Sequence, residues 1–186
     1  MKDIISESFE PVYGQLCWGV TYYRMTNLSM NFGTPRLEVV REPQERKSRD
    51  PLIRRIGRRR HVSVTGRWSL WVYLSYWKIC YKGHEATSGS SLRKIGGATG
   101  DIEGQRLVNV EVDRETGATR FSFDLGGTLD VRRRERDCDD ELWILRKPSG
   151  YFLSVRANGN YDHVPGCGKR RGVRGRQLPV MRKETP

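Results

Sequence analysis

The sequence lacks the features of several protein classes. Its 186 residues include no apolar run near the roughly 18 residues that a membrane helix needs. The first ten residues alternate charges with short apolar pairs, and they lack the apolar core of a signal peptide. Four cysteines are too few for a disulfide framework in a chain of this length. These absences predict a soluble, cytoplasmic protein with no membrane segment, and the length predicts one domain.

Residue patterns of catalytic and metal sites are scarce as well. Walker loops, dinucleotide fingerprints and the G-x-S-x-G elbow are absent, and no two cysteines have zinc-site spacing. His163 lies four residues before Cys167. These two residues together supply at most half of the ligands of a metal site, or one Cys–His pair for nucleophilic catalysis. Glu111 and Asp113 share one face of an expected strand, as catalytic carboxylates and solvent-facing residues both do. Because no pattern is complete, the sequence predicts no metal and no cofactor, and it favours a non-enzymatic protein.

Positive charge is in excess, and two segments carry it. Lysine and arginine number 34 against 22 aspartates and glutamates, a net charge of +12. Residues 61–165 are balanced, with 15 basic and 14 acidic side chains, so the excess belongs to 41–60 and 166–186. The clustered basic residues are Arg54, Arg55, Arg58, Arg59 and Arg60 in the first segment, and Lys169, Arg170, Arg171, Arg174 and Arg176 in the second.

Two interpretations of these basic segments remain open. The spacing of apolar residues within 41–60 permits a basic loop or a short helix with its arginines toward water. The glycines that alternate with cationic residues in 166–186 predict a mobile, basic C-terminal arm. Arginine clusters can neutralise phosphates and give salt-sensitive, sequence-independent affinity for nucleic acid. Basic connectors that contact only water have the same composition.

Apolar residues recur with period two, which predicts a chain made mainly of β-strands. Residues 68–80 form the longest apolar stretch, and both of its faces are apolar. This pattern predicts one long strand buried at the centre of a sheet. Residues 83–104 predict a loop with one helical turn at 91–95. Further strands are expected at 20–23, 37–40, 61–65, 107–113, 119–125, 128–134, 141–146, 151–155 and 160–163.

Strands that follow one another through tight turns predict an antiparallel meander. Seven to nine such strands, rolled into a barrel or packed as a sandwich, would leave few free edges. We therefore predict a single mainly β domain over residues 14–165 with little helix. An N-terminal extension at 1–13 precedes this domain in the prediction, and the basic arm at 166–186 follows it.

A distributed set of residues resembles a family of small uncharacterised bacterial proteins. The resemblance covers about residues 14–166 and has the pattern GxxCWxV, NFGxPxLEV, WxLWVY, FDLGG, LWxL and PSG. In this chain the six motifs begin at Gly14, Asn31, Trp68, Phe123, Leu142 and Pro148. The resemblance implies one intact stand-alone domain, and it supplies no catalytic residues.

Binding of a partner protein is the function that these observations favour. Small β-rich bacterial domains without catalytic residues are often immunity proteins or antitoxins, which is an argument by analogy. Large amphipathic side chains anchor protein interfaces. We expect Tyr76 and Trp77, near the end of the long strand, to be exposed and to serve this role. Sequence-independent binding of nucleic acid through 54–60 and 169–176 is the alternative.

Overall fold

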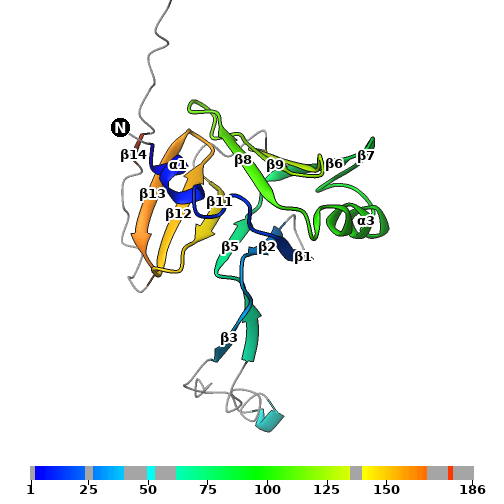
Figure 1. Cartoon of the computed structure of the whole chain (residues 1–186), viewed down its shortest axis with the longest axis horizontal. Helices are drawn as coiled ribbons and strands as arrows, with labels where there is room; N and C mark the ends of the chain where they lie inside the picture. The colour runs from blue at the N-terminus through cyan, green and yellow to red at the C-terminus, as the bar shows by residue number, and fades with distance from the viewer. Residues whose placement is uncertain are drawn as a thin grey trace, which may run out of the picture.

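The computed structural model describes residues 3–23, 27–39, 50–52, 62–134, 140–166 and 176–177. Within these ranges the chain forms two antiparallel sheets, a two-stranded ribbon and the helices α1 and α3 (Figure 1). The mainly β class with little helix is therefore confirmed. The described strands do not close into a barrel, and the two sheets share one core instead.

The larger sheet has seven strands in the order β1-β2-β5-β11-β12-β13-β14, and every neighbouring pair is antiparallel. The bounds of these strands are Cys17–Tyr23 (β1), Asn27–Phe32 (β2), Trp68–Val72 (β5), Glu141–Arg146 (β11), Tyr151–Arg156 (β12), Asn160–Pro165 (β13) and Arg176–Gln177 (β14).

The smaller sheet has five strands in the order β7-β6-β10-β9-β8, again all antiparallel. Their bounds are Tyr76–Tyr81 (β6), His84–Thr87 (β7), Leu107–Val112 (β8), Thr119–Phe123 (β9) and Thr128–Arg132 (β10). The two sheets meet at one corner, where Leu16 and Arg106 form a β-bridge between the starts of β1 and β8. We call the two sheets and both helices the body.

The N-terminal segment belongs to the body. Helix α1 (Ile4–Phe9) buries Phe9, whose ring makes edge contacts with Phe121 and Trp143 at centroid distances of 6.0 and 5.7 Å. Val12 is buried in the same core. Residues 1–13 were predicted to be an extension before the domain. The predicted start of the domain at residue 14 is wrong, because apolar residues of α1 and Val12 are part of the core that the two sheets share.

The prediction of one long strand over 68–80 is wrong. Strand β5 ends at Val72 in the larger sheet, and β6 begins at Tyr76 in the smaller one. Between them Leu74 has a positive φ of 41°, and its N–H donates to Asn27 Oδ1 at 3.1 Å. The stretch is apolar on both faces because it serves two sheets, each with one face toward the core.

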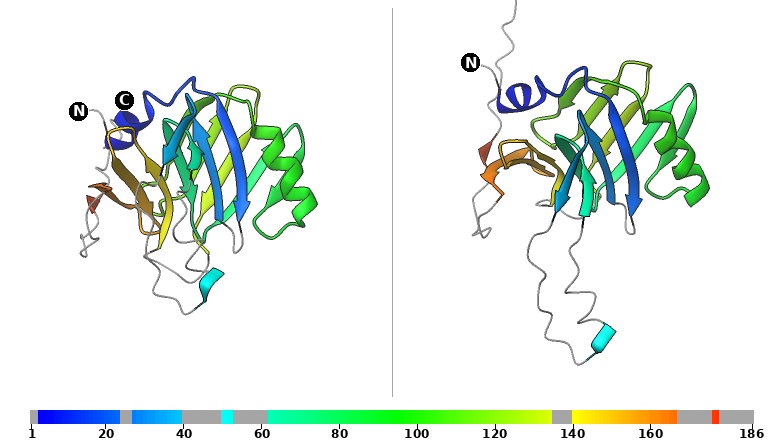
Figure 2. Two further views of the ribbon diagram at one scale, coloured as in Figure 1. Left: turned by 90° about the horizontal axis from the view of Figure 1, so that it is seen from below. Right: turned by 60° about the horizontal axis from the view of Figure 1, so that its bottom comes forward.

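The predicted loop over 83–104 is also wrong, because it contains β7 and the 11-residue helix α3 (Leu92–Ile102). Ser91 caps the helix, and Ile95, Ala98 and Ile102 are among its buried residues. Glycine is a weak helix former, and the three glycines of α3 conceal it in the sequence. Helices α1 and α3 lie at opposite sides of the body (Figure 2). Among the described helices none has the length and apolar character needed to cross a membrane.

The ribbon consists of β3 (Arg36–Val39) and β4 (Val62–Thr65), which pair only with each other among the described strands. It continues the hairpin of β2 and β5 beyond the end of the larger sheet. Figure 1 shows it projecting from the body.

Candidate functional site

The ribbon leaves the larger sheet through a one-residue bulge. Phe32 pairs with Trp68 and Arg36 pairs with Thr65, so residues 33–35 on one strand lie opposite residues 66–67 on the other. An extra residue on one strand bends the pair and increases its twist. The sequence permits the bend because Gly66 lies where a Cβ atom would be 2.6 Å from the Trp68 carbonyl oxygen.

One face of the ribbon is apolar and open to water. Leu37 lies opposite Val64 and Val39 lies opposite Val62, and directly paired residues of antiparallel strands share a face. The exposed fractions of these four residues range from 44% for Val39 to 71% for Leu37. Four neighbouring aliphatic side chains are therefore in contact with solvent.

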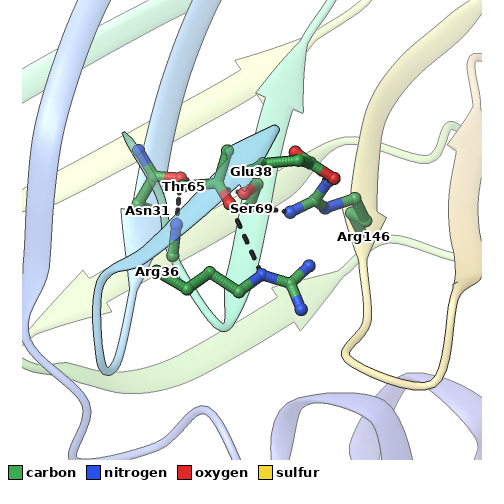
Figure 3. Close-up of polar contacts among 7 residues, drawn as sticks. Asn31, Arg36, Glu38, Thr65, Ser69 and Arg146 are labelled. Atoms are coloured by element: carbon green, nitrogen blue, oxygen red, sulfur yellow. Dashed lines mark hydrogen bonds and ion pairs between the residues drawn. The ribbon is translucent and has the colours of Figure 1, made fainter. Parts of the chain in front are cut away.

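The polar face of the ribbon is bonded to the body. Arg146 Nη1 of β11 donates to both carboxylate oxygens of Glu38, at 3.0 and 3.1 Å, and Nη2 donates to Thr65 Oγ1 at 3.1 Å (Figure 3). The Arg146 side chain is only 13% exposed, which strengthens these charge-assisted bonds. These bonds leave the apolar face of the ribbon as its free face.

Polar contacts also fix the bend at the base of the ribbon. Asn31 Oδ1 accepts hydrogen bonds from the Gly66 N–H and from Ser69 Oγ, both at 2.9 Å (Figure 3). These bonds fix Gly66, which lies between β4 and β5. On the strand that runs from β2 to β3, the Gly33 carbonyl oxygen accepts a hydrogen bond from Trp18 Nε1 at 2.7 Å. Both strands are thus anchored at the point where they leave the sheet.

The basic segment predicted at 41–60 connects the two strands of the ribbon along the chain. Residues 40–61 contain nine basic and three acidic side chains, a net charge of +6. The cluster Arg54, Arg55, Arg58, Arg59 and Arg60 lies outside the described residues. By sequence alone, this basic segment is the link that joins the end of β3 to the start of β4.

The second basic segment is only partly described. Lys169, Arg170, Arg171 and Arg174 lie outside the described residues. Arg176 is in β14, where it pairs with Tyr161 of β13. Two residues of the predicted arm at 166–186 therefore form a short strand of the larger sheet, and the mobility of the arm stays a prediction.

The predicted interface at Tyr76 and Trp77 is wrong for Trp77. This residue is fully buried, and its ring contacts Tyr22 edge-on at a centroid distance of 5.9 Å. Tyr76 is half-buried beneath the Arg132 guanidinium, 4.3 Å from the ring centroid. The physical reason is the break at 73–75, which starts a new strand and turns Trp77 into the core.

The two carboxylates at the end of β8, Glu111 in the strand and Asp113 just after it, do not form an acid–base pair. Asp113 Oδ1 accepts from the N–H groups of Thr116 and Glu115, both at 2.9 Å, and these bonds lower the pKa of Asp113. Glu111 lies opposite Arg120 and accepts a hydrogen bond from Asn109 at 3.1 Å. Asp113 therefore closes a turn, and Glu111 belongs to a polar sheet face.

The structure shows one hydroxyl–amine pair that the sequence did not indicate. Lys147 Nζ donates to Ser8 Oγ at 3.0 Å, and burial lowers the pKa of Lys147. A base beside a hydroxyl is a nucleophile arrangement, but Ser8 is fully buried and a substrate cannot reach it. The pair joins α1 to the end of β11. It escaped sequence analysis because 139 positions separate its members.

Metal and cysteine chemistry find little support in the geometry. His163 stacks on Tyr151 at a centroid distance of 5.1 Å, and Cys167 lies outside the described residues. Across the part of the chain that the structure describes, no three His, Cys, Asp or Glu side chains gather to hold a metal ion.

Comparison of the chain with protein-family models, with curated proteins and with solved structures finds no match. The features that point to a function are therefore those of the molecule itself, and the projecting ribbon is the most distinctive of them.

Proposed function

We propose that this protein binds a partner protein through the apolar face of the β3–β4 ribbon. The observation that carries the proposal is the exposure of Leu37, Val39, Val62 and Val64 on one face, while the opposite face is bonded to Arg146. Contiguous exposed apolar patches mark interaction sites. A two-stranded ribbon is only marginally stable alone, so a partner that covers this face also stabilises it.

The charge of the segment that links β3 to β4 in the sequence indicates the kind of partner. With a net charge of +6 in residues 40–61, a complementary surface carries carboxylates around an apolar strip. A second copy of this chain fits poorly, because two such basic segments would repel each other. An acidic protein is the expected occupant. By analogy, a role like that of an immunity protein or an antitoxin would suit such binding.

Exposure of aliphatic side chains also separates this proposal from nucleic-acid binding. Phosphate contacts come from cationic and hydrogen-bonding groups, and they do not require the four apolar residues of the ribbon. Arg54–Arg60 would serve either partner, whereas Leu37 and Val64 serve only a partner with an apolar surface.

A capture experiment with matched variants tests the proposal. Tagged protein is incubated with native extract, with and without nuclease, and compared with the double variant Leu37→Ser/Val64→Ser. The control is Val108→Ser/Leu125→Ser, because these residues are 48% and 61% exposed but lie outside the ribbon. We expect a protein band that survives nuclease and moderate salt, disappears with the ribbon variant and persists with the control.

Two other outcomes would redirect the interpretation. Equal capture by the ribbon variant and the control would show that the apolar face is not the interface. Recovery of nucleic acid alone, lost between about 50 and 200 mM salt and lost when Arg54, Arg55, Arg58, Arg59 and Arg60 become Ser, would establish the alternative function.

A further inference from the structure

A hollow of about 540 Å³ lies at the base of the ribbon. It is lined from three parts of the chain: Leu16 and Trp18 at the start of β1, Pro35 before β3, and Glu103 and Arg106 beside β8. This volume is within the range of small-ligand sites in proteins.

One part of the lining is apolar and held in place. Leu16 is 44% exposed and Trp18 is half-buried. The Trp18 indole cannot rotate freely, because its Nε1 donates to the Gly33 carbonyl at 2.7 Å. Together with Pro35, these side chains offer a preorganised surface to a flat apolar group such as an aromatic ring.

The other part of the lining carries one donor group and one acceptor group. Arg106 Nη1 donates to the Gly14 carbonyl at 2.7 Å, and Glu103 Oε1 accepts from the Gly19 N–H at 2.8 Å. Each side chain is thereby oriented by the backbone. A guanidinium has five N–H groups and a carboxylate has about four acceptor positions, so both retain capacity for a ligand.

These two charges cancel, so the hollow has no preference for an ion of either sign. A ligand that satisfies both must present an acceptor to Arg106 and a donor to Glu103. A peptide group has this combination in its C=O and N–H. The lining thus fits a peptide that carries an aromatic side chain.

We infer that the hollow receives an aromatic side chain of an extended peptide segment, and that this segment belongs to the partner of the ribbon. Pro35 is bonded directly to Arg36, the first residue of β3, so one partner can occupy both surfaces. The assignment of the segment to that partner rests on the proposed function. The peptide specificity of the hollow can be tested without the partner.

Fluorine NMR of the full chain labelled with fluorotryptophan provides the test. The chain has five tryptophans, and a Trp18→Phe variant identifies the Trp18 resonance. N-acetyltyrosinamide, which has an aromatic ring between two peptide groups, is compared with N-acetylalaninamide, which lacks the ring. We expect a saturable shift of the Trp18 resonance with the tyrosine probe, with a dissociation constant of about a millimolar, and no shift with the alanine probe.

Two variants examine the separate parts of the lining. Arg106→Gln removes the charged donor and should weaken binding about tenfold, as expected for the loss of a hydrogen bond to a charged group. Leu16→Ser removes apolar surface and should abolish the saturable shift. The unchanged Trp77 and Trp143 resonances, from two fully buried residues, would show that each variant is folded.

A Trp18 resonance that does not respond to the tyrosine probe would overturn the inference. Equal shifts at Trp18 and Trp71, or equal shifts with both probes, would do the same, because they indicate non-specific contact. Since the probes need no partner, these results would leave the capture experiment with the ribbon variants unaffected. Conversely, a positive probe result with failed capture would support the hollow as a peptide site and reject the ribbon as the interface.

Discussion

The body and the ribbon share one sequence pattern and differ in what it produces. Along β5, the alternate residues Trp68, Leu70 and Val72 are buried, whereas Val62 and Val64 of β4 in the same hairpin are about half exposed. The difference is the second layer, because the buried residues of β5 belong to the core that the two sheets share, whereas nothing described covers β4. Alternation therefore identifies a strand, while burial depends on whether another layer extends over it.

The largest difference between the body and the ribbon should appear when one apolar side chain is removed from each. Trp77→Ala should lower the free energy of unfolding by about 3–5 kcal/mol, because it leaves a large cavity in the core. Val64→Ala should change it by less than about 0.5 kcal/mol, as expected for an exposed position. Urea denaturation measures both. Similar losses for the two variants would mean that the ribbon is packed like the body.

The junction between the two regions should respond next most strongly. In Gly66→Ala the new Cβ would lie 2.6 Å from the Trp68 oxygen and 2.9 Å from the Phe32 nitrogen, both backbone atoms. Overpacking of this kind destabilises by about 1–3 kcal/mol. Gly89→Ala is the matched control, because the nearest atom is 3.9 Å from its Cβ position. If both variants unfold at the same denaturant concentration, the backbone around Gly66 is not packed as closely as the 2.6 Å distance indicates.

Alkaline pH should weaken the body through Cys17. Burial raises the pKa of the Cys17 thiol well above its ordinary 9.0, so the folded chain keeps a proton that the unfolded chain releases above pH 9. Stability should therefore fall as pH rises beyond about 9, by up to about 1.4 kcal/mol per pH unit from this group.

Denaturant unfolding between about pH 8 and pH 10 isolates this effect. Cys17→Ala should flatten the loss, whereas Cys80→Ala, at a partly exposed thiol, should leave it in place. Burial also raises the pKa of Tyr13 from 10.0, which adds a loss of the same sign at higher pH. A slope that is identical in the wild type and in Cys17→Ala would contradict the assignment.

The smallest expected effect separates the ribbon from the body by its dynamics. Arg146→Met removes the bonds to Glu38 and Thr65 and should make amide exchange in 36–39 and 62–65 about tenfold faster, which equals ~1.4 kcal/mol. Exchange in the body should change little. Arg120→Met, which removes the paired bonds to Asp130 in the smaller sheet, should leave exchange in the ribbon unchanged. Faster exchange throughout the molecule would show that Arg146 supports the body instead.

Much of the fold after residue 107 could be predicted from local signals. The predicted strand at 141–146 coincides with β11, and the hairpin between β8 and β9 turns at Gly117 with a positive φ of 68°. Alternation and turn residues are sufficient there because each strand pairs with its neighbour in sequence. Helix α3 escaped prediction because its glycines lower helix propensity, and its stability comes from packing against β1, β6 and β7.

The candidate site was predictable only in part. Strands near 37–40 and 61–65 follow from alternation, but the sequence does not reveal that they extend past the second layer. The burial of Trp77 was missed for a related reason, since Leu74 is not a typical turn residue and gives no sign of a break. The hollow joins Leu16, Pro35 and Arg106, which only the topology brings together.

The break at residues 73–75 has a consequence for folding. Strands β5 and β6 follow each other in the chain but belong to different sheets. When β5 pairs in the larger sheet, β6 is therefore held next to the smaller sheet, and the reverse is also true. The Ser75 hydroxyl donates to the Leu142 carbonyl at 3.1 Å, so the crossing is also attached to β11. The two sheets should consequently appear and disappear together, in a single cooperative transition, with the ribbon as the part that can vary in sequence without disturbing it.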